Sequence, residues 1–391
     1  MDIFECILDE LCVHHIRVSS DPSRHTWRSR TCVRDLSTED QTSRDLDMPY
    51  IAALNNLCQT SKQLNALATR RLYHTLTGFV TYNRWRKIAR TLVVRKDLGR
   101  LVRHLHIRSV SHVGGSPPPE VLSYFEEQAT AIGRLWCGRL ALLHRMGGFV
   151  EDRCRVLLVL LTSLCPNLES IVCATPANGL FGGPFYSPFT FYPEAEMPSL
   201  LAFEIRSRLP RHPTIMSLCK AAPNLKILRI RDLKTLGEAG DFPFYRPPEG
   251  AEDLLFFVDI RGRLVHPPVK NVTFDRVEEL ELIDCSLGVE TFEQCLRLVP
   301  NLKRLRLTFC ELDGVRRRFR FVHLAPKEAV ASLLSLAPSL ESFELDYRNW
   351  GSQPPNFPLS STRHDYAKVD VEEAMRPLEA RGVNCTVSMD Y

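Results

Sequence analysis

Residues 300–307 have the sequence Pro-Asn-Leu-Lys-Arg-Leu-Arg-Leu, and this short phrase decides how the rest of the chain is interpreted. Its last four residues alternate charged and apolar side chains, which is the period of a β-strand with one buried face. The preceding residues 291–299 place apolar side chains at helical spacing, and proline is common just after a helix ends. The phrase therefore predicts a helix, a turn and a short strand as one unit.

The same phrase recurs along the chain. Related copies begin at residues 166, 198, 223 and 338, and a version without the proline begins at Val277. Residues 102–107 supply a candidate first strand, and residues 371–389 are expected to form a last helix, a glycine cap at Gly382 and a closing strand. Each unit has an apolar face that it cannot cover alone, so neighbouring units are expected to stack side by side.

This repetition resembles a leucine-rich-repeat solenoid over roughly residues 100–391. The resemblance implies an α/β fold in which a curved parallel sheet is backed by helices, one of them opening at Pro326. Most units exceed the usual ~20–29 residues, so the repeat is irregular and carries turn-rich insertions. One insertion, 176–193, is crowded with aromatic residues, and it either contacts a partner or packs on the flank of the repeats.

The composition fits a globular protein that is long enough to bury a full core. Of the 391 residues, 44% are hydrophobic and 25% are charged, and the formal net charge of +4 is too small to indicate nucleic acid as a partner. The acidic start, Asp2 and Glu5, does not fit a secretory signal, and no apolar stretch predicts a membrane span. The 13 cysteines are scattered without a C-x-x-C pair, which indicates reduced thiols. We therefore expect a protein of the cytoplasm, the nucleus or both, without a membrane partner.

The start of the chain carries a different pattern. Residues 2–12 place apolar side chains on one helical face, and two further amphipathic helices are predicted from Ile51 onward, the second with Thr60 as its N-cap. Residues 2–11 and 54–68 resemble an F-box, and the stretch that follows is similar to the link between F-box and repeats in many fungal proteins. The resemblance implies a module at 1–76 that binds the Skp-family adaptor of an SCF-type cullin-RING ubiquitin ligase, through Ile3, Phe4, Ile7, Leu8, Leu11, Leu54, Leu57, Leu64 and Leu67.

Two features depart from the family pattern. The Leu-Pro pair that normally opens the module is absent, and residues 15–49 form a polar insertion that is predicted to be disordered. The alternative is that these helices merely cap the first repeat, which would make the chain a leucine-rich-repeat interaction scaffold with no ubiquitin-ligase link.

The repeats at 77–391 are expected to hold a protein substrate of unknown identity within a hetero-complex to which the chain contributes as a monomer. By strand alternation, charged side chains on the face away from the helices are predicted to face solvent and to supply the candidate substrate surface: Glu204, Arg206, Arg229, Arg231, Glu281, Arg306, Glu344 and Asp346. The same charges could instead pair across strands and only steady the sheet. No catalytic, metal-binding or cofactor-binding motif is present in the sequence, so we expect neither enzyme activity nor a cofactor.

Overall fold

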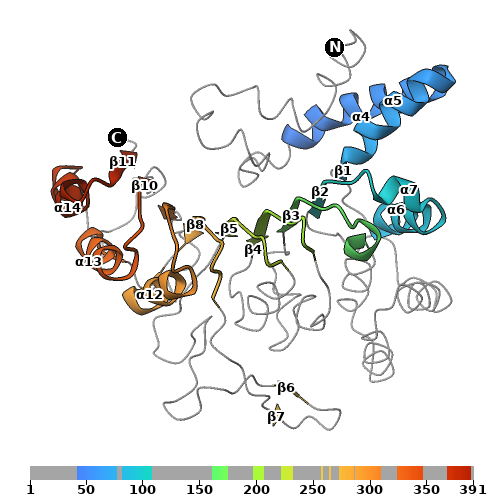
Figure 1. Cartoon of the computed structure of the whole chain (residues 1–391). Helices are drawn as coiled ribbons and strands as arrows, with labels where there is room; N and C mark the ends of the chain where they lie inside the picture. Colours follow the sequence, from blue (N-terminus) through green and yellow to red (C-terminus); the bar gives the residue numbers. More distant parts are fainter. Residues whose placement is uncertain are drawn as a thin grey trace, which may run out of the picture. The chain divides into compact units, whose positions relative to one another are not determined.

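The computed structural model describes a set of ranges that together cover the repeats and the helices before them. These ranges are 42–76, 82–107, 161–174, 197–206, 222–231, 257–258, 264–265, 273–285, 287–309, 324–346 and 368–388. The predicted helix at 2–12, most of the 15–49 insertion and the aromatic loop at 176–193 lie outside them. Within these ranges the fold is α/β, and no helix is both long and apolar enough to cross a membrane (Figure 1).

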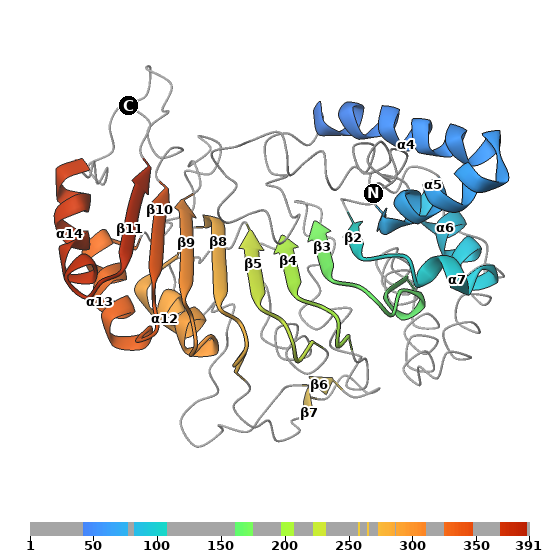
Figure 2. The ribbon, with the colours of Figure 1, turned by 45° about the horizontal axis from the view of Figure 1, so that its top comes forward.

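Nine strands form one parallel sheet in the order β1-β2-β3-β4-β5-β8-β9-β10-β11, and two short strands form a separate antiparallel pair (Figure 2). The strands of the sheet are β1 (Thr75–Leu76), β2 (His104–Ile107), β3 (Ser170–Ala174), β4 (Ala202–Arg206), β5 (Ile227–Arg231), β8 (Glu279–Cys285), β9 (Arg304–Phe309), β10 (Ser342–Asp346) and β11 (Asn384–Ser388). The antiparallel pair is β6 (Phe257–Val258) with β7 (Leu264–Val265). Each copy of the repeated phrase ends in a strand of the large sheet, which confirms the strands predicted from it.

The described helices are α4 (Thr42–Thr60), α5 (Lys62–His74), α6 (Tyr82–Val94), α7 (Lys96–Gly99), α12 (Val289–Leu298), α13 (Pro326–Leu336) and α14 (Lys368–Ala380). Pro326 opens α13 as predicted, and the Glu328 carboxylate accepts a hydrogen bond of 2.9 Å from the Ala325 backbone N–H at the helix start. Gly382, with φ of 88°, ends α14, and the backbone N–H of Val383 donates to the Leu378 carbonyl. The predicted glycine cap is therefore confirmed.

Helix α4 corrects the extent of the predicted insertion. Residues 42–49 were expected to be disordered, but they form the first two turns of α4, with Pro49 inside the helix. Extending an existing helix costs less than starting one, so the apolar part of α4 can carry this polar extension. The N-cap of α5 is Ser61 and not Thr60, since the Ser61 hydroxyl accepts from the Leu64 backbone N–H.

The chain divides into two compact units. The first holds residues 1–181 and 194–202, with α4 to α7 and strands β1 to β3; the second holds residues 182–193 and 203–391, with β5 to β11 and α12 to α14. This division differs from the boundary expected at residue 76, because α5 runs directly into β1 and β1 pairs with β2 in register.

Similar backbone contacts recur between several successive copies of the phrase, and two copies add an asparagine contact. The carbonyl oxygen of Arg103 accepts from the N–H groups of both Glu169 and Ser170, at 2.7 and 3.1 Å, and the carbonyls of Lys226, Glu278 and Lys303 accept two bonds each in the same way. The asparagine of the phrase adds a side-chain tie: the Asn167 and Asn301 amides donate to the Arg100 and Asp275 carbonyls, each at 2.8 Å. The phrase thus specifies both a strand and its attachment to the preceding repeat.

Apolar residues of the strands align in the same register and form the core of the second unit. Leu280 lies beside Leu228 and Leu305, and Leu305 lies beside Phe343. These four side chains are at most 2% exposed. Helices α12, α13 and α14 contribute further buried side chains to the second unit, among them Phe292, Leu296, Leu333, Val371 and Leu378. Because burial of a large apolar side chain stabilises a fold by about 1.5–3 kcal/mol, this row of leucines and phenylalanines is the main stabilising element of the unit.

Gly99 gives a direct test of the packing in the first unit. It ends α7, is buried, and faces the backbone carbonyl of Leu164 so closely that an added Cβ would overlap the carbonyl oxygen. We expect Gly99→Ala to destabilise the protein by roughly 1–3 kcal/mol, because a backbone atom cannot move aside cheaply. Thermal melting followed by circular dichroism measures the effect, with the exposed neighbour Arg100→Ala as control. Equal melting temperatures for Gly99→Ala and the parent chain would contradict this packing.

Candidate functional site

Strands β5, β8, β9 and β10 place four charged side chains in one register row. Arg229 lies beside Glu281, Glu281 beside Arg306, and Arg306 beside Glu344. We call these four residues the charged row. Because residues in register on parallel strands point to the same face of a sheet, the charges alternate in sign along one line.

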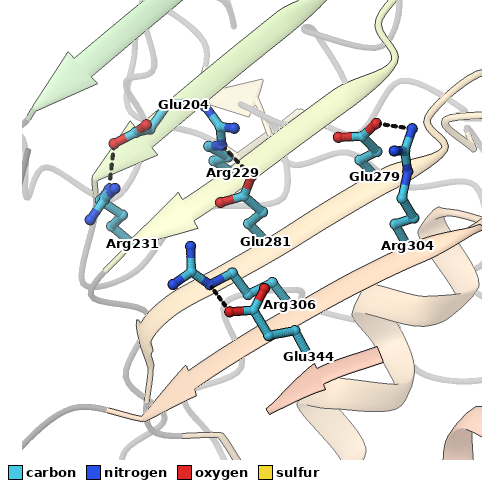
Figure 3. Close-up of polar contacts among 8 residues, drawn as sticks. All are labelled: Glu204, Arg229, Arg231, Glu279, Glu281, Arg304, Arg306 and Glu344. Carbon is cyan, nitrogen blue, oxygen red and sulfur yellow. Dashed lines mark hydrogen bonds and ion pairs between the residues drawn. The ribbon is translucent and has the colours of Figure 1, made fainter. Parts of the chain in front are cut away.

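Ion pairs connect the charged row and its neighbours (Figure 3). The Arg229 Nε donates to Glu281 Oε1 at 2.6 Å, and the Arg306 Nε lies 3.3 Å from Glu344 Oε1. A second contact of 3.6 Å joins Arg306 Nη2 to Asp346 Oδ2. Two flanking pairs, Arg231 with Glu204 and Arg304 with Glu279, extend the network on the same face.

The burial of this network corrects the prediction that its residues face solvent. Six of the predicted surface residues are buried, namely Glu204, Arg229, Arg231, Glu281, Arg306 and Asp346. All five residues of β5 are buried, so the strand is covered on both faces. Alternation correctly separated the charged face from the apolar face, but it carries no information on what covers the charged face. The eighth predicted residue, Arg206, has its side chain outside the described part.

Exposure rises toward the end of the row. The side chains of Arg229 and Glu281 are 4% and 9% exposed, and the Glu344 side chain is 28% exposed. On the last strand, β11, Thr386 stands in register with Glu344 and is exposed. The row is therefore most exposed at β10 and β11, whereas Arg229 and Glu281 are accessible only if their cover is removed.

Burial and pairing act against each other on the ionisation of Arg229. Burial lowers the pKa of its guanidinium, but the carboxylates of Glu281 and Glu204 raise it more, so the pKa ends above its usual value and the group stays charged. The balance is different at Glu279. Burial raises the pKa of this carboxyl, and the opposing effect of Arg304 is smaller, so the pKa stays above its usual value despite the ion pair.

The α4–α5 hairpin holds the predicted adaptor-binding residues that the structure describes. Leu54 and Ala68 form a small core of their own, with Leu57, Cys58, Leu67 and Leu72 packed against it. Leu54 is thus committed to packing between the two helices, whereas Leu64 is half-buried and does not belong to the cluster. The other five, Ile3, Phe4, Ile7, Leu8 and Leu11, lie outside the described residues.

The first unit holds a histidine–serine contact in its sheet. His104 and Ser170, which are paired across β2 and β3, share a hydrogen bond of 2.8 Å, and the rings of His74 and His104 meet edge to face with centroids 5.0 Å apart. Burial raises the pKa of the Cys165 thiol to about 12, as it does for Cys295 in the second unit, so both are protonated at neutral pH and are poor nucleophiles. In the described ranges no three histidine, cysteine or acidic side chains converge as a metal site would require.

Sequence reasoning overlooked two members of the network. Glu279 and Arg304 stand two residues before Glu281 and Arg306 on the same strands, so the alternation rule that selected the later pair also applies to them. Thr386 was overlooked because it is uncharged, although its place in the closing strand gives it the position next to Glu344.

Comparison with known proteins identifies no relative. No protein-family model matches the chain, and no curated protein matches it either. The function is therefore inferred from the sequence patterns and from the geometry of the two candidate surfaces, the α4–α5 hairpin and the charged row.

Arg231 tests the energetic weight of the buried pairs. Replacing it with Met removes the cation paired with Glu204, whose side chain is 3% exposed and whose Oε2 has no hydrogen-bond partner among the described residues. We expect Arg231→Met to lower the free energy of unfolding by roughly 3–5 kcal/mol, because the buried Glu204 carboxylate loses its bonded cation and keeps only the attraction of Arg229. Urea denaturation measures this. Arg297→Met in the more exposed pair with Glu293 is the control and should cost under about 1 kcal/mol; equal losses in the two variants would contradict the burial of the network.

Glu279 makes a prediction about pH. Its pKa is raised in the folded state, so its protonated form favours folding, and this contribution is lost as the pH rises through the folded pKa. Glu279→Gln cannot ionise, so we expect its stability relative to the parent chain to increase between acidic and neutral pH. Denaturation midpoints of both proteins across that range test the sign, and a relative stability that falls with rising pH would contradict it.

Proposed function

We propose that the chain is a substrate-recruiting adaptor of an SCF-type cullin-RING ubiquitin ligase. In this proposal the N-terminal F-box-like module binds a Skp-family adaptor, which joins it to the cullin, and the repeats form an irregular leucine-rich-repeat-like solenoid that binds a protein substrate. The observation that carries the proposal is the order of the parts: a helical hairpin with its own small core is followed directly by the first strand of a repeat sheet. The proposal places the protein in the cytoplasm or nucleus, as a monomer within the complex.

The hairpin supports the adaptor role because some of its apolar side chains form its own core and others lie outside that core. The packing of Leu54 on Ala68 holds α4 and α5 together, so the remaining half-buried side chains are not all needed for folding. Leu64 is the best candidate for partner contact because it lies outside that cluster. A helical module that presents apolar side chains while keeping its own core suits the binding of other helices.

A free-standing repeat scaffold is the second candidate. It is favoured by the contact of α5 with both β1 and α7, which joins the hairpin to the start of the sheet. A repeat array needs a capping element with a polar outer face at its end, and the hairpin can serve as that cap without any ligase partner. The two functions differ in whether apolar side chains of the hairpin bind another protein.

Co-purification separates the two functions. We expect the full-length chain to retain a Skp-family adaptor and a cullin in stoichiometric amounts, and a chain lacking residues 1–76 to retain neither. Leu64→Asp should lose capture while keeping the parent melting temperature, because Leu64 lies outside the hairpin core.

Gln63→Asp is the matched control, since Gln63 is an exposed neighbour on the same helix and its replacement adds the same charge. It should capture the adaptor as the parent does. A folded full-length chain that captures no Skp-family adaptor would reject the ligase proposal and leave the scaffold.

A further inference from the structure

The alternation of charge along the charged row ends at β10, and the last strand, β11, has no charged residue at the next position of the row. From β5 to β10 the row alternates as Arg229, Glu281, Arg306 and Glu344, and the next position on β11 is Thr386. Each inner member has an oppositely charged residue in register on both sides, whereas within the described strands Glu344 has a cation in register on β9 alone. That cation, Arg306, is shared with Asp346 and lies 3.3 Å from Glu344, which is longer than the 2.7–2.9 Å of a strong charged hydrogen bond. Glu344 is therefore the most exposed charge of the row, and its neighbour in register on β11 is uncharged.

Strand β11 is the last of the sheet and has an accessible edge. Among the described residues it pairs with β10 and with no other strand, and none of its five side chains is fully buried (Figure 2). The Asn384 N–H donates to the Glu341 carbonyl on the β10 side. Because backbone groups alternate sides along a strand, Thr386 and Ser388 also face β10, and the N–H and C=O groups of Cys385 and Val387 face outward. Such an edge can accept one more strand.

The geometry lets a long cation on an added strand reach Glu344. Strands lie about 4.7–4.9 Å apart, so an added residue beside Thr386 would stand about 10 Å from Glu344, a span that a lysine or arginine and a glutamate side chain bridge together. Threonine is short and exposed, and it leaves the space above it open. A basic residue at this position would continue the alternation of charge along the row.

We propose that an extended, basic segment of a protein partner adds to the edge of β11 as a tenth strand of the large sheet, with a lysine or arginine beside Thr386 that pairs with Glu344. A second copy of this chain fits less well, because β11 itself, Asn-Cys-Thr-Val-Ser, contains no basic residue to place there. The inference rests on the proposed function in one respect: if the chain is a ligase adaptor, the partner that adds this strand is its substrate. It does not involve the α4–α5 hairpin, so failure of adaptor capture leaves it intact.

Two labelled peptides test the proposal against the full-length chain by fluorescence anisotropy. The lysine probe has the sequence Thr-Val-Thr-Lys-Thr-Val-Thr, and the glutamate probe differs in its central residue alone. We expect the lysine probe to bind at least about tenfold more tightly, because like charges on neighbouring strands repel. Glu344→Gln should reduce that preference to less than about threefold, with Asp346 still available to Arg306.

Val387→Pro tests the edge itself. Its N–H faces outward, so proline there removes a donor from the free edge and keeps the bonds to β10, and we expect both probes to lose binding while the melting temperature is retained. Failure of the folded chain to bind the lysine probe would overturn the proposal, as would equal affinity for the two probes or an unchanged preference in Glu344→Gln. A dimer in sedimentation that Val387→Pro dissolves would overturn it in favour of self-association.

Discussion

Buried ion pairs between neighbouring parallel strands fix the alignment of the second unit. The Arg229 side chain is 4% exposed and bonded to Glu281 at 2.6 Å, and the same row continues to Arg306 and Glu344. A shift of one strand by a single residue would turn its charges into the apolar core and its leucines out of it. Such a shift would leave several buried charges unpaired, which is far more costly than the loss of surface pairs. The row therefore makes one register much more stable than its neighbours.

The repeated phrase also helps to fix the register of the strands. Its leucines fill the core, Asn167 and Asn301 bond backbone carbonyls of the preceding repeat, and at several strand entries one backbone carbonyl accepts two N–H groups from the next repeat. These contacts attach a strand to its neighbour at the end that precedes the charged residues. Local hydrogen bonds and long-range ion pairs thus agree on the same register, as expected for a sequence that folds to one structure.

The strands and the end of α14 could be predicted from sequence because they depend on local patterns: alternation in the repeated phrase, and the left-handed glycine at Gly382. The burial of Arg229, Arg231 and Glu204 could not, because alternation along a strand separates its two faces but does not tell whether the charged face is covered. The start of α4 was placed too late for a related reason. Polar residues 42–49 look unstructured alone, and their helical state depends on the apolar turns that follow. For the charged row, strand alternation correctly identified which charged residues share a face. It did not predict that most of them are buried in ion pairs within the sheet instead of being open to a partner.

Because the middle of the charged row is buried, the candidate recognition surfaces are the α4–α5 hairpin and the β10–β11 edge, at the two ends of the described chain. The middle of the row has a structural role. A double-mutant cycle between Arg229 and Glu281 tests that role most directly, with Arg229→Met, Glu281→Met and the double variant compared by urea denaturation. The account predicts a coupling energy above about 2 kcal/mol, with the double variant more stable than either single variant, since both buried charges are then removed together. A coupling below about 0.5 kcal/mol, the level of exposed pairs, would contradict it.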